Sequence, residues 1–254
     1  MNNMSAIIEL KNIEKSFGIY RTNRKVVLKN IDLTIEQGDF VTILGPSGSG
    51  KTTLLNILSS LDRPTKGVVK IDNESIDSML EYQLAKCRQE NIGFIFQEFY
   101  LLEELTVYDN IASYLYLKKL TNQQMKEKIQ DIARKIGIED LLDKQVKNCS
   151  RGQQQRVVIA RALVNQPKII VGDELTGNLD YQNKKAILNL LVELNHQGIT
   201  VVQVTHDLDC AMYSHRVLYL KDGTIQDDFT TDTLTKTKFH DRLVNYFKED
   251  ESLS

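Results

Sequence analysis

The feature that most constrains this chain is a glycine-rich segment at residues 45–53, Gly-Pro-Ser-Gly-Ser-Gly-Lys-Thr-Thr. Two glycines separated by four residues and followed at once by Lys and Thr form the phosphate-binding loop pattern. An apolar run at 40–44 precedes the segment, and apolar residues at helical spacing follow it at 54–58. A strand before the pattern and a helix after it make a chance match rare. The segment therefore predicts a nucleotide site between a β-strand and an α-helix.

The residue types of this segment suit phosphate chemistry. Glycines allow consecutive backbone N–H groups to turn toward phosphate oxygens, and the following helix adds the positive end of its dipole. The Lys51 ammonium can neutralise the outer phosphates, and the Thr52 hydroxyl can be a ligand of Mg²⁺. We therefore expect every residue of the segment to contact the nucleotide: Gly45, Pro46, Ser47, Gly48, Ser49, Gly50, Lys51, Thr52 and Thr53.

Composition and charge narrow the classes of function. The chain has 254 residues, 41% hydrophobic and 26% charged, which is enough for one large domain or two closely packed ones. Its net charge of −2 lacks the excess of positive charge that nucleic-acid-binding proteins usually carry, so we expect no nucleic-acid partner. Three cysteines far apart in sequence indicate a reducing compartment rather than a disulfide framework. Neither a signal peptide nor an apolar run of about 20 residues is evident, so any membrane span is expected in another chain.

Hydrophobic patterning predicts an α/β chain. Strands are expected at residues 5–10, 31–36, 40–44, 68–71, 92–96, 168–172, 200–204 and 216–220. Helices are expected at about 50–61 and 182–196, and residues 221–224 have the composition of a hairpin turn. Residues 98–150 are rich in Leu, Lys, Gln and Glu at helical spacing, which indicates a helical subdomain inserted into the core. Alternating strands and helices imply a mostly parallel sheet, with the ligand at the carboxyl ends of its strands.

A second motif lies more than 100 residues downstream of the phosphate loop. An apolar strand ends in Asp173, which would place a carboxylate beside the loop, where it can hold Mg²⁺ directly or through water. Glu174 points elsewhere because side chains alternate along a strand, and it can orient and deprotonate a water in line with the γ-phosphate. A strand that ends in an acidic turn is common by itself. Because a phosphate loop is also present in this chain, we favour a catalytic role for the two carboxylates.

From about residue 5 to residue 225 the chain resembles the ATP-binding subunit of an ABC transporter. Further segments occur in that family's order and spacing: the signature-like segment at 150–156, Gln97 at the end of a core strand, the segment 175–180, and Thr205-His206-Asp207 after a strand. The aromatic residue that stacks on adenine aligns best with Phe17, and Tyr20 is a close rival. The resemblance implies a P-loop NTPase core with a mostly parallel sheet, an N-terminal antiparallel β subdomain and an inserted α-helical subdomain at about 98–150. It implies an ABC ATPase domain over 1–227, and residues 228–254 are then a polar extension with a short helix.

The resemblance also implies a reaction and partners. The reaction is Mg-dependent ATP hydrolysis, with ATP and Mg²⁺ as cofactors. A second copy of the chain would complete the site in a head-to-tail dimer that encloses two ATP molecules. An integral membrane permease would use the motion, which places the chain in the cytoplasm at the inner face of the membrane. The implied catalytic residues are Lys51, Glu174 and His206, those near the metal are Thr52, Gln97 and Asp173, and those of the dimer interface are Ser150, Gly152, Gln153 and Asp180.

Four positions depart from the family pattern. Cys149 and Arg151 stand where the family has Leu and Gly in its signature segment, and Gly172 and Leu175 stand where it has Ala and Pro around the acidic pair. Every residue with a direct chemical role is retained. We therefore expect the site to hydrolyse ATP, and reverting Arg151 to Gly tests this expectation.

The loop, together with residues 57–62, 93–97 and 176–180, resembles one branch of the family. That branch drives lipoprotein release, macrolide export and resistance to antimicrobial peptides such as bacitracin. Two alternatives stay open. One is an ATPase of this type that regulates cell-wall or cell-division machinery without moving a solute, and the other is an ATP-binding module with weak or lost catalysis. A translation factor would need two tandem cassettes, and a DNA-repair ATPase would need a longer insertion than 98–150.

Overall fold

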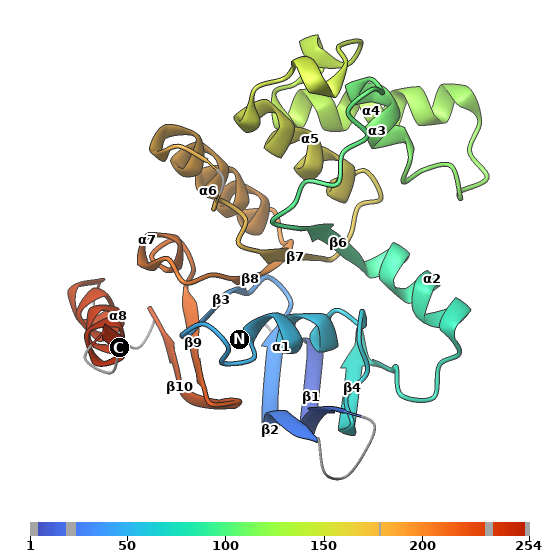
Figure 1. Cartoon of the computed structure of the whole chain (residues 1–254). Helices are drawn as coiled ribbons and strands as arrows, with labels where there is room; N and C mark the ends of the chain where they lie inside the picture. Colours follow the sequence, from blue (N-terminus) through green and yellow to red (C-terminus); the bar gives the residue numbers. More distant parts are fainter. Residues whose placement is uncertain (1–4, 19–23, 178, 232–235, 252–254) are drawn as a thin grey trace.

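The computed structural model describes residues 5–18, 24–177, 179–231 and 236–251. A six-stranded sheet in the order β10-β9-β3-β8-β7-β6 forms its centre (Figure 1). Strands β9, β3, β8, β7 and β6 run parallel, and β10 pairs antiparallel with β9, so the prediction of a mostly parallel sheet is confirmed. The strands are β3 Phe40–Leu44, β6 Ile92–Ile95, β7 Ile169–Asp173, β8 Thr200–Val204, β9 Arg216–Lys221 and β10 Thr224–Thr230.

The central strand β3 is buried along its whole length because both faces of the sheet are covered. Val41 and Ile43 pack with the apolar side chains of α1 (Lys51–Leu58), whereas Phe40 packs on the opposite face. That face is covered by α5 (Arg151–Leu163) and α6 (Tyr181–His196). The continuous apolar run that predicted this strand is therefore the pattern of a strand buried on two sides.

A second, antiparallel sheet lies beside the first, in the order β2-β1-β4-β5. Its strands are β1 Ala6–Phe17, β2 Lys25–Glu36, β4 Lys66–Ile71 and β5 Glu74–Ser75. Their buried side chains join the same apolar cluster as α1, so this sheet packs against the helix that begins at the phosphate loop. The N-terminal antiparallel part of the fold is confirmed.

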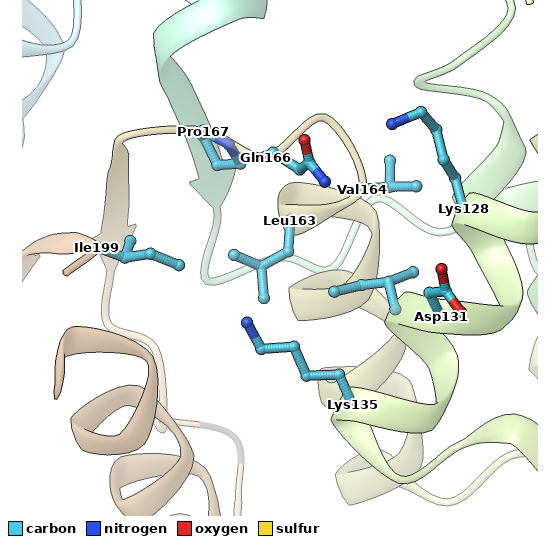
Figure 2. A pocket seen from close by; sticks show the side chains of 9 residues that line it. Lys128, Asp131, Lys135, Leu163, Val164, Gln166, Pro167 and Ile199 are labelled. Atoms are coloured by element: carbon cyan, nitrogen blue, oxygen red, sulfur yellow. The ribbon is translucent and has the colours of Figure 1, made fainter. Parts of the chain in front are cut away.

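The segment between β6 and β7 is helical, as predicted, and lies at the top of Figure 1. A single apolar cluster joins these helices to the sheet through α5. Figure 2 shows a hollow beside this junction, which is lined by side chains of α4 (Asn122–Ile136) and by Leu163 at the end of α5. Helix α4 ends at Ile136 and is capped by Gly137, whose φ of 72° lies in the left-handed region. The elements are α3 Val107–Ala112, α4 Asn122–Ile136, the 3₁₀ turns η2 Glu139–Leu141 and η3 Val146–Asn148, and then α5.

A C-terminal helix, α8 (Lys236–Glu251), packs on the β9–β10 hairpin. Phe239 and Leu243 of this helix are buried against Phe229, and the Tyr246 ring stacks on Tyr219 at a centroid distance of 4.1 Å. The Asp227 carboxylate accepts two hydrogen bonds from Arg242, at 2.6 and 2.7 Å, and one from Tyr246. The predicted terminal helix is therefore present.

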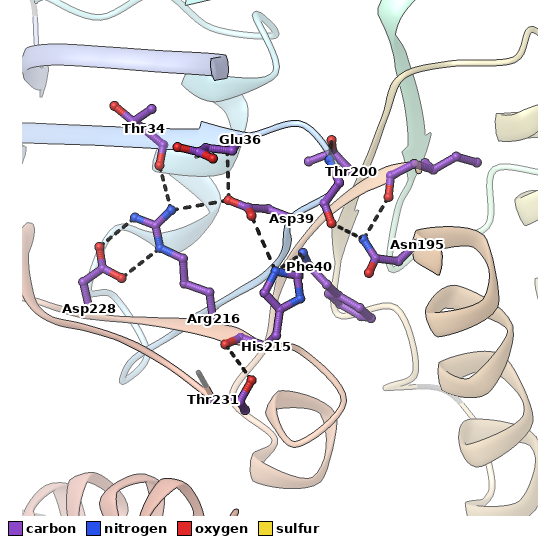
Figure 3. A network of polar contacts seen from close by, with 12 residues as sticks. Thr34, Glu36, Asp39, Phe40, Asn195, Thr200, His215, Arg216, Asp228 and Thr231 are labelled. Atoms are coloured by element: carbon purple, nitrogen blue, oxygen red, sulfur yellow. Dashed lines mark hydrogen bonds and ion pairs between the residues drawn. The ribbon is translucent and has the colours of Figure 1, made fainter. Parts of the chain in front are cut away.

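A polar network closes the edge of the sheet where β3 and β9 begin (Figure 3). The Arg216 guanidinium donates two hydrogen bonds to Asp228, at 2.9 and 2.7 Å, and one to the Thr34 carbonyl oxygen at 2.7 Å. His215 and Arg216 both lie 3.5 Å from the Asp39 carboxylate. Burial by itself would raise the pKa of Asp39, but the hydrogen bond from His215 and the neighbouring charges hold it below its ordinary value.

Some boundaries differ from the sequence prediction. The first strand was expected at 5–10 but continues to Phe17, with register shifts against β2. The helix expected at about 50–61 ends at Leu58. Helix α2 (Glu81–Asn91) was not predicted, whereas the short helix expected between residues 204 and 216 is present as α7 (Leu208–Ala211). Across the described ranges, no helix combines the length and apolar character that crossing a membrane requires.

Candidate nucleotide site

The phosphate loop joins the carboxyl end of β3 to the first residue of α1. A Cβ atom at Gly45 would lie 2.0 Å from the Leu220 carbonyl oxygen of β9, so only glycine fits there. Gly50 has a φ of 104°, and a Cβ there would lie 2.9 Å from the Leu28 side chain of β2. Both glycines of the sequence pattern are therefore required by the fold, because the loop passes between the two sheets.

The Lys51 side chain folds back over the loop. Its ammonium donates hydrogen bonds to the carbonyl oxygens of Gly45 at 2.8 Å and of Pro46 at 2.9 Å. Because α1 begins at Lys51, the free N–H groups of its first turn point toward the same loop. The buried Ser49 hydroxyl has no hydrogen-bond partner among the described residues. The loop thus combines a cation, free backbone donors and an unsatisfied hydroxyl, which fits the binding of phosphate oxygens.

Thr52 and Asp173 meet at the edge of the loop, where the Thr52 hydroxyl donates to the Asp173 carboxylate at 3.0 Å. Burial and the neighbouring Glu174 charge raise the pKa of Asp173, although the Thr52 hydrogen bond and Lys51 oppose this. A nearby cation would favour the charged form of such a carboxylate. Hydroxyl and carboxylate oxygens are the donors that Mg²⁺ takes together with phosphate oxygens and water, so this pair fits the ion.

Glu174 is held by the segment that follows the neighbouring strand. Its carboxylate accepts hydrogen bonds from the Thr205 hydroxyl at 3.0 Å and from the His206 backbone N–H at 3.1 Å. The His206 ring Nδ1 lies 2.7 Å from the same carboxylate. The Glu174 side chain is only 15% exposed, whereas His206 is 74% exposed. The carboxylate is therefore fixed in orientation while the imidazole stays open to a ligand.

The sheet explains why these groups meet. Strands β7 and β8 are parallel neighbours, so the residues that follow them lie at one edge. The Glu174 N–H donates to the Val204 carbonyl oxygen at 2.9 Å, which extends the pairing by one residue. Glu174 has a φ of 48°, the left-handed region that non-glycine residues rarely occupy. Such backbone strain is frequent at functional sites, where the surrounding structure enforces it.

Gln97 and Phe17 lie at the margins of this site. Because Ile95 of β6 pairs with Gly172 of β7, Gln97 follows β6 at the same edge of the sheet as Asp173. Phe17 ends β1 with 48% of its surface exposed, and its pairing partner in β2 is Lys25. That position is close along β2 to the residues that touch Gly50. The rival stacking residue, Tyr20, lies outside the described residues.

The N-terminus of α5 holds the signature-like residues. Ser150 is the N-cap, and it exchanges hydrogen bonds with Gln153 at 3.3 and 3.0 Å, which is a capping box. Gly152 is buried, and a Cβ there would lie 2.3 Å from the Asn183 amide oxygen of α6. Asn183 is held in turn by Asp180, the N-cap of α6, at 3.0 and 2.5 Å. The signature helix and the Asp180 loop are thus packed together through Asn183, a residue that the sequence analysis missed.

A second contact missed by the sequence analysis involves two departures from the family pattern. The Leu175 side chain occupies the space beside Gly172, where a Cβ would lie 2.1 Å from Leu175 Cδ2. The Leu175 carbonyl oxygen accepts a hydrogen bond from the buried Gln155 amide at 2.9 Å. Leucine at 175 and glycine at 172 are therefore a matched pair beside the acidic residues.

Lys184 of α6 connects this helix to the segment that follows His206. Its ammonium pairs with Asp207 and lies 3.6 Å from Asp209. Burial lowers the pKa of Lys184, but the hydrogen bond to Asp207 outweighs it and the pKa is raised. The predicted site residues therefore gather in two groups. One is the phosphate loop with Asp173, Glu174 and His206, and the other surrounds the first turns of α5 and α6.

Comparison with known proteins identifies the family. Residues 28–177 match the model of the family described as ABC transporter. The bacitracin export ATP-binding protein BceA of Halalkalibacterium halodurans is 44% identical over 221 residues, 87% of each chain. The macrolide export ATP-binding/permease protein MacB of Bdellovibrio bacteriovorus is 42% identical over 87% of this chain and 34% of its own length.

A solved structure supports the same assignment. It is the dimeric, post-hydrolysis state of the ATP-binding cassette MJ0796, from Methanocaldococcus jannaschii, bound to ADP and phosphate. The two chains share 39% identity and a TM-score of 0.79, over 88% of this chain and 98% of that one. The chain therefore belongs to the ABC transporter family, as an ATP-binding ATPase subunit.

Proposed function

We propose that this chain hydrolyses Mg-ATP, as one of two identical subunits, to power a separate membrane permease that exports an antimicrobial peptide. The observation that supports the proposal best is the carboxylate of Glu174, held by Thr205 and His206 next to the Thr52–Asp173 pair. A buried, oriented carboxylate beside a phosphate loop is what the activation of an attacking water requires.

In the proposed reaction each residue has one task. Glu174 accepts a proton from the attacking water, and its bonds to Thr205 and His206 keep the accepting oxygen in place. Because His206 is bound through Nδ1, its Nε2 can face the γ-phosphate. Mg²⁺, held by Thr52, Asp173 and Gln97, would neutralise charge that develops on the phosphate oxygens.

A phosphate loop surrounds only one side of ATP, which explains the need for a second copy. Phosphoryl transfer needs donors on both sides of the γ-phosphate. The N-terminus of α5 has free backbone N–H groups, and Ser150, Gly152 and Gln153 lie in its first turn, with Asp180 nearby. We propose that these residues face the ATP of the partner subunit. The dimeric state of the related cassette supports this arrangement.

An apolar hollow of about 510 Å³ on the helical side fits a membrane partner. It lies between α2 and the segment after α3, and its rim includes Tyr82 and Leu117, which are 69% and 85% exposed. A contiguous exposed apolar patch with polar residues at its rim, here Lys86, Arg88 and Gln89, marks an interaction surface on many proteins. We propose that the permease docks here, which holds the chain at the inner face of the membrane. The hollow is lined by Leu61, Tyr82, Ala85, Ile92, Phe94, Tyr114 and Leu117 among others.

We also propose that the ATPase domain spans residues 1–227, with a helical subdomain at about 98–150 and an added extension at 228–254. The packing of α8 on β9 and β10 supports an extension that docks on the ATPase domain instead of forming a separate unit.

The choice of cargo rests on the relatives. BceA, named for bacitracin export, matches this chain over 87% of its own length. MacB, named for macrolide export, carries ATP-binding and permease parts in one chain and matches over only 34% of its length. A peptide antibiotic is therefore the proposed cargo. The alternatives are a regulator of cell-wall or cell-division machinery that moves no solute, and a weak ATP-binding module.

The experiment compares Glu174→Gln with the matched control Glu139→Gln, an exposed carboxylate on the helical side. Glu174→Gln should lower ATP hydrolysis at least about a hundredfold and accumulate an ATP-bound dimer in size-exclusion chromatography. Glu139→Gln should behave as the parent. A monomeric Glu174→Gln protein in Mg-ATP would contradict the dimer, and a parent protein without hydrolysis would favour the weak module. Coexpression with a candidate permease, followed by measurement of bacitracin susceptibility, separates export from wall regulation: resistance that requires hydrolysis by this chain supports export.

A further inference from the structure

Arg151 is placed where a cation is electrostatically unfavourable. It is the first helical residue of α5, and the positive end of a helix dipole repels a cation there. Serine at the N-cap and glutamine at position 153 already complete the capping of this helix. Arg151 is not needed to begin the helix, so its contacts must explain it.

The Arg151 guanidinium lies over the ring of Phe99, 5.7 Å from the ring centroid. This is the distance range of a cation–π contact. Among the described residues, no carboxylate forms an ion pair with Arg151, although Glu98 and Glu103 line the same hollow of about 240 Å³. Phe99 is therefore the one side-chain partner that the described part of the chain assigns to this guanidinium.

Phe99 follows Gln97 by two residues, and Gln97 lines the same hollow as Arg151. The segment 97–101 is also held from the other end of α5. Arg161 donates hydrogen bonds to the carbonyl oxygens of Phe99 at 2.7 Å and Tyr100 at 2.6 Å. Because Arg161 is buried and binds the backbone, it ties the segment to α5 independently of Arg151. The Arg151 contact adds a link between the ring of Phe99 and the first turn of α5.

We propose that Arg151 is a positioning residue that couples the Gln97 segment to the N-terminus of α5. The inference rests on the proposed function, in which Gln97 contacts the ATP of its own subunit and α5 faces the ATP of the partner. A shift of Gln97 on nucleotide binding moves Phe99, and Arg151 transmits this shift to Ser150 and Gly152. One subunit therefore links the two nucleotide sites of the dimer.

The test uses four variants: Arg151→Gln, Phe99→Leu, their combination, and the control Arg134→Gln on α4, an exposed arginine outside the site. Leucine keeps the apolar packing of residue 99 and removes the ring. Steady-state ATPase rates over a range of ATP concentrations give the Hill coefficient. The same changes in a Glu174→Gln background give the ATP concentration for half-maximal dimer.

Arg151→Gln and Phe99→Leu should each lower the Hill coefficient and raise the half-maximal ATP concentration about two- to fivefold, the range of an exposed cation–π contact. The combination should match either single change, and Arg134→Gln should match the parent. An unaltered Phe99→Leu beside an altered Arg151→Gln would overturn the proposal, because Arg151 would then act on the phosphates directly. An unaltered Arg151→Gln would overturn it too. A Glu174→Gln parent that stays monomeric in ATP would refute the proposed dimer itself.

Discussion

Replacing Gly172 by alanine should destabilise the chain, because Leu175 already fills the space that a methyl group would need. The new Cβ would lie 2.1 Å from Leu175 Cδ2 and 2.4 Å from its Cγ, far inside the roughly 3.5–4.0 Å of a normal carbon contact. Leu175 is buried and cannot rotate freely away. Overpacking of this kind costs about 1–3 kcal/mol, which corresponds to a fall in melting temperature of about 2–12 °C in a chain of this size.

Shortening Leu175, the other member of the pair, tests whether the two positions are coupled. Leu175→Ala should cost about 2–5 kcal/mol because it leaves a cavity. In the double variant the alanine methyl at 172 occupies part of that cavity, so the combined loss should be smaller than the sum by about 0.5–3 kcal/mol. Gly177→Ala is the matched control, since a Cβ there meets nothing closer than 3.6 Å.

Urea unfolding followed by circular dichroism measures the free energy of unfolding of the parent and of the four variants. ATPase rates are recorded on the same preparations. Gly172→Ala should also slow hydrolysis, because a displaced Leu175 shifts the adjoining Glu174. Gly177→Ala should stay within about 0.5 kcal/mol of the parent. Additive losses in the double variant, or a Gly172→Ala protein as stable as the parent, would refute the matched pair.

Two further predictions follow from other contacts. Gly152→Ala should weaken ATP-driven dimerisation because its methyl group would collide with Asn183, and adding Asn183→Ala should restore dimerisation. Size-exclusion chromatography in the presence of ATP measures the dimer fraction of each variant. A double variant that dimerises no better than Gly152→Ala would mean that the methyl group obstructs the partner subunit instead. Asp39 has a folded-state pKa below its ordinary 3.8, so the stability that its charge contributes is complete at neutral pH and is lost as the pH falls below that value. Asp39→Asn should therefore unfold more easily at pH 7 and lose less additional stability on acidification, and parallel pH profiles of urea midpoints would contradict this.

Much of the site could be predicted because its signals are local. The phosphate loop is continuous in sequence, and an apolar run marks the buried strand on which it ends. Asp173 and Glu174 also end an apolar strand, and parallel pairing brings the ends of β7 and β8 together. The meeting of Glu174 with His206 follows from that topology, although its 2.7 Å distance does not.

Elements with a weak pattern were missed or shortened. Helix α2 buries only Leu84 and Cys87 and its other residues are mostly polar, so it has no apolar stripe at helical spacing. Strand β1 was cut at residue 10 because its register shifts between Leu10 and Ile13 interrupt the alternation of buried and exposed residues. In both cases tertiary packing, and not a local pattern, determines the structure.

Departures from a family pattern are harder to interpret, because one sequence shows which residue changed but not which residue it touches. Taken alone, Gly172 would suggest a loosened strand and Leu175 a lost turn, yet the Leu175 side chain fills the space that the absence of a Cβ at Gly172 leaves. Arg151 would likewise suggest a damaged signature, but Phe99, 52 positions earlier in the chain, provides a partner for its charge. A site with compensated departures should keep its chemistry, whereas a decayed site would leave the new groups without partners. The partners found for these residues therefore favour a working ATPase over a weak module.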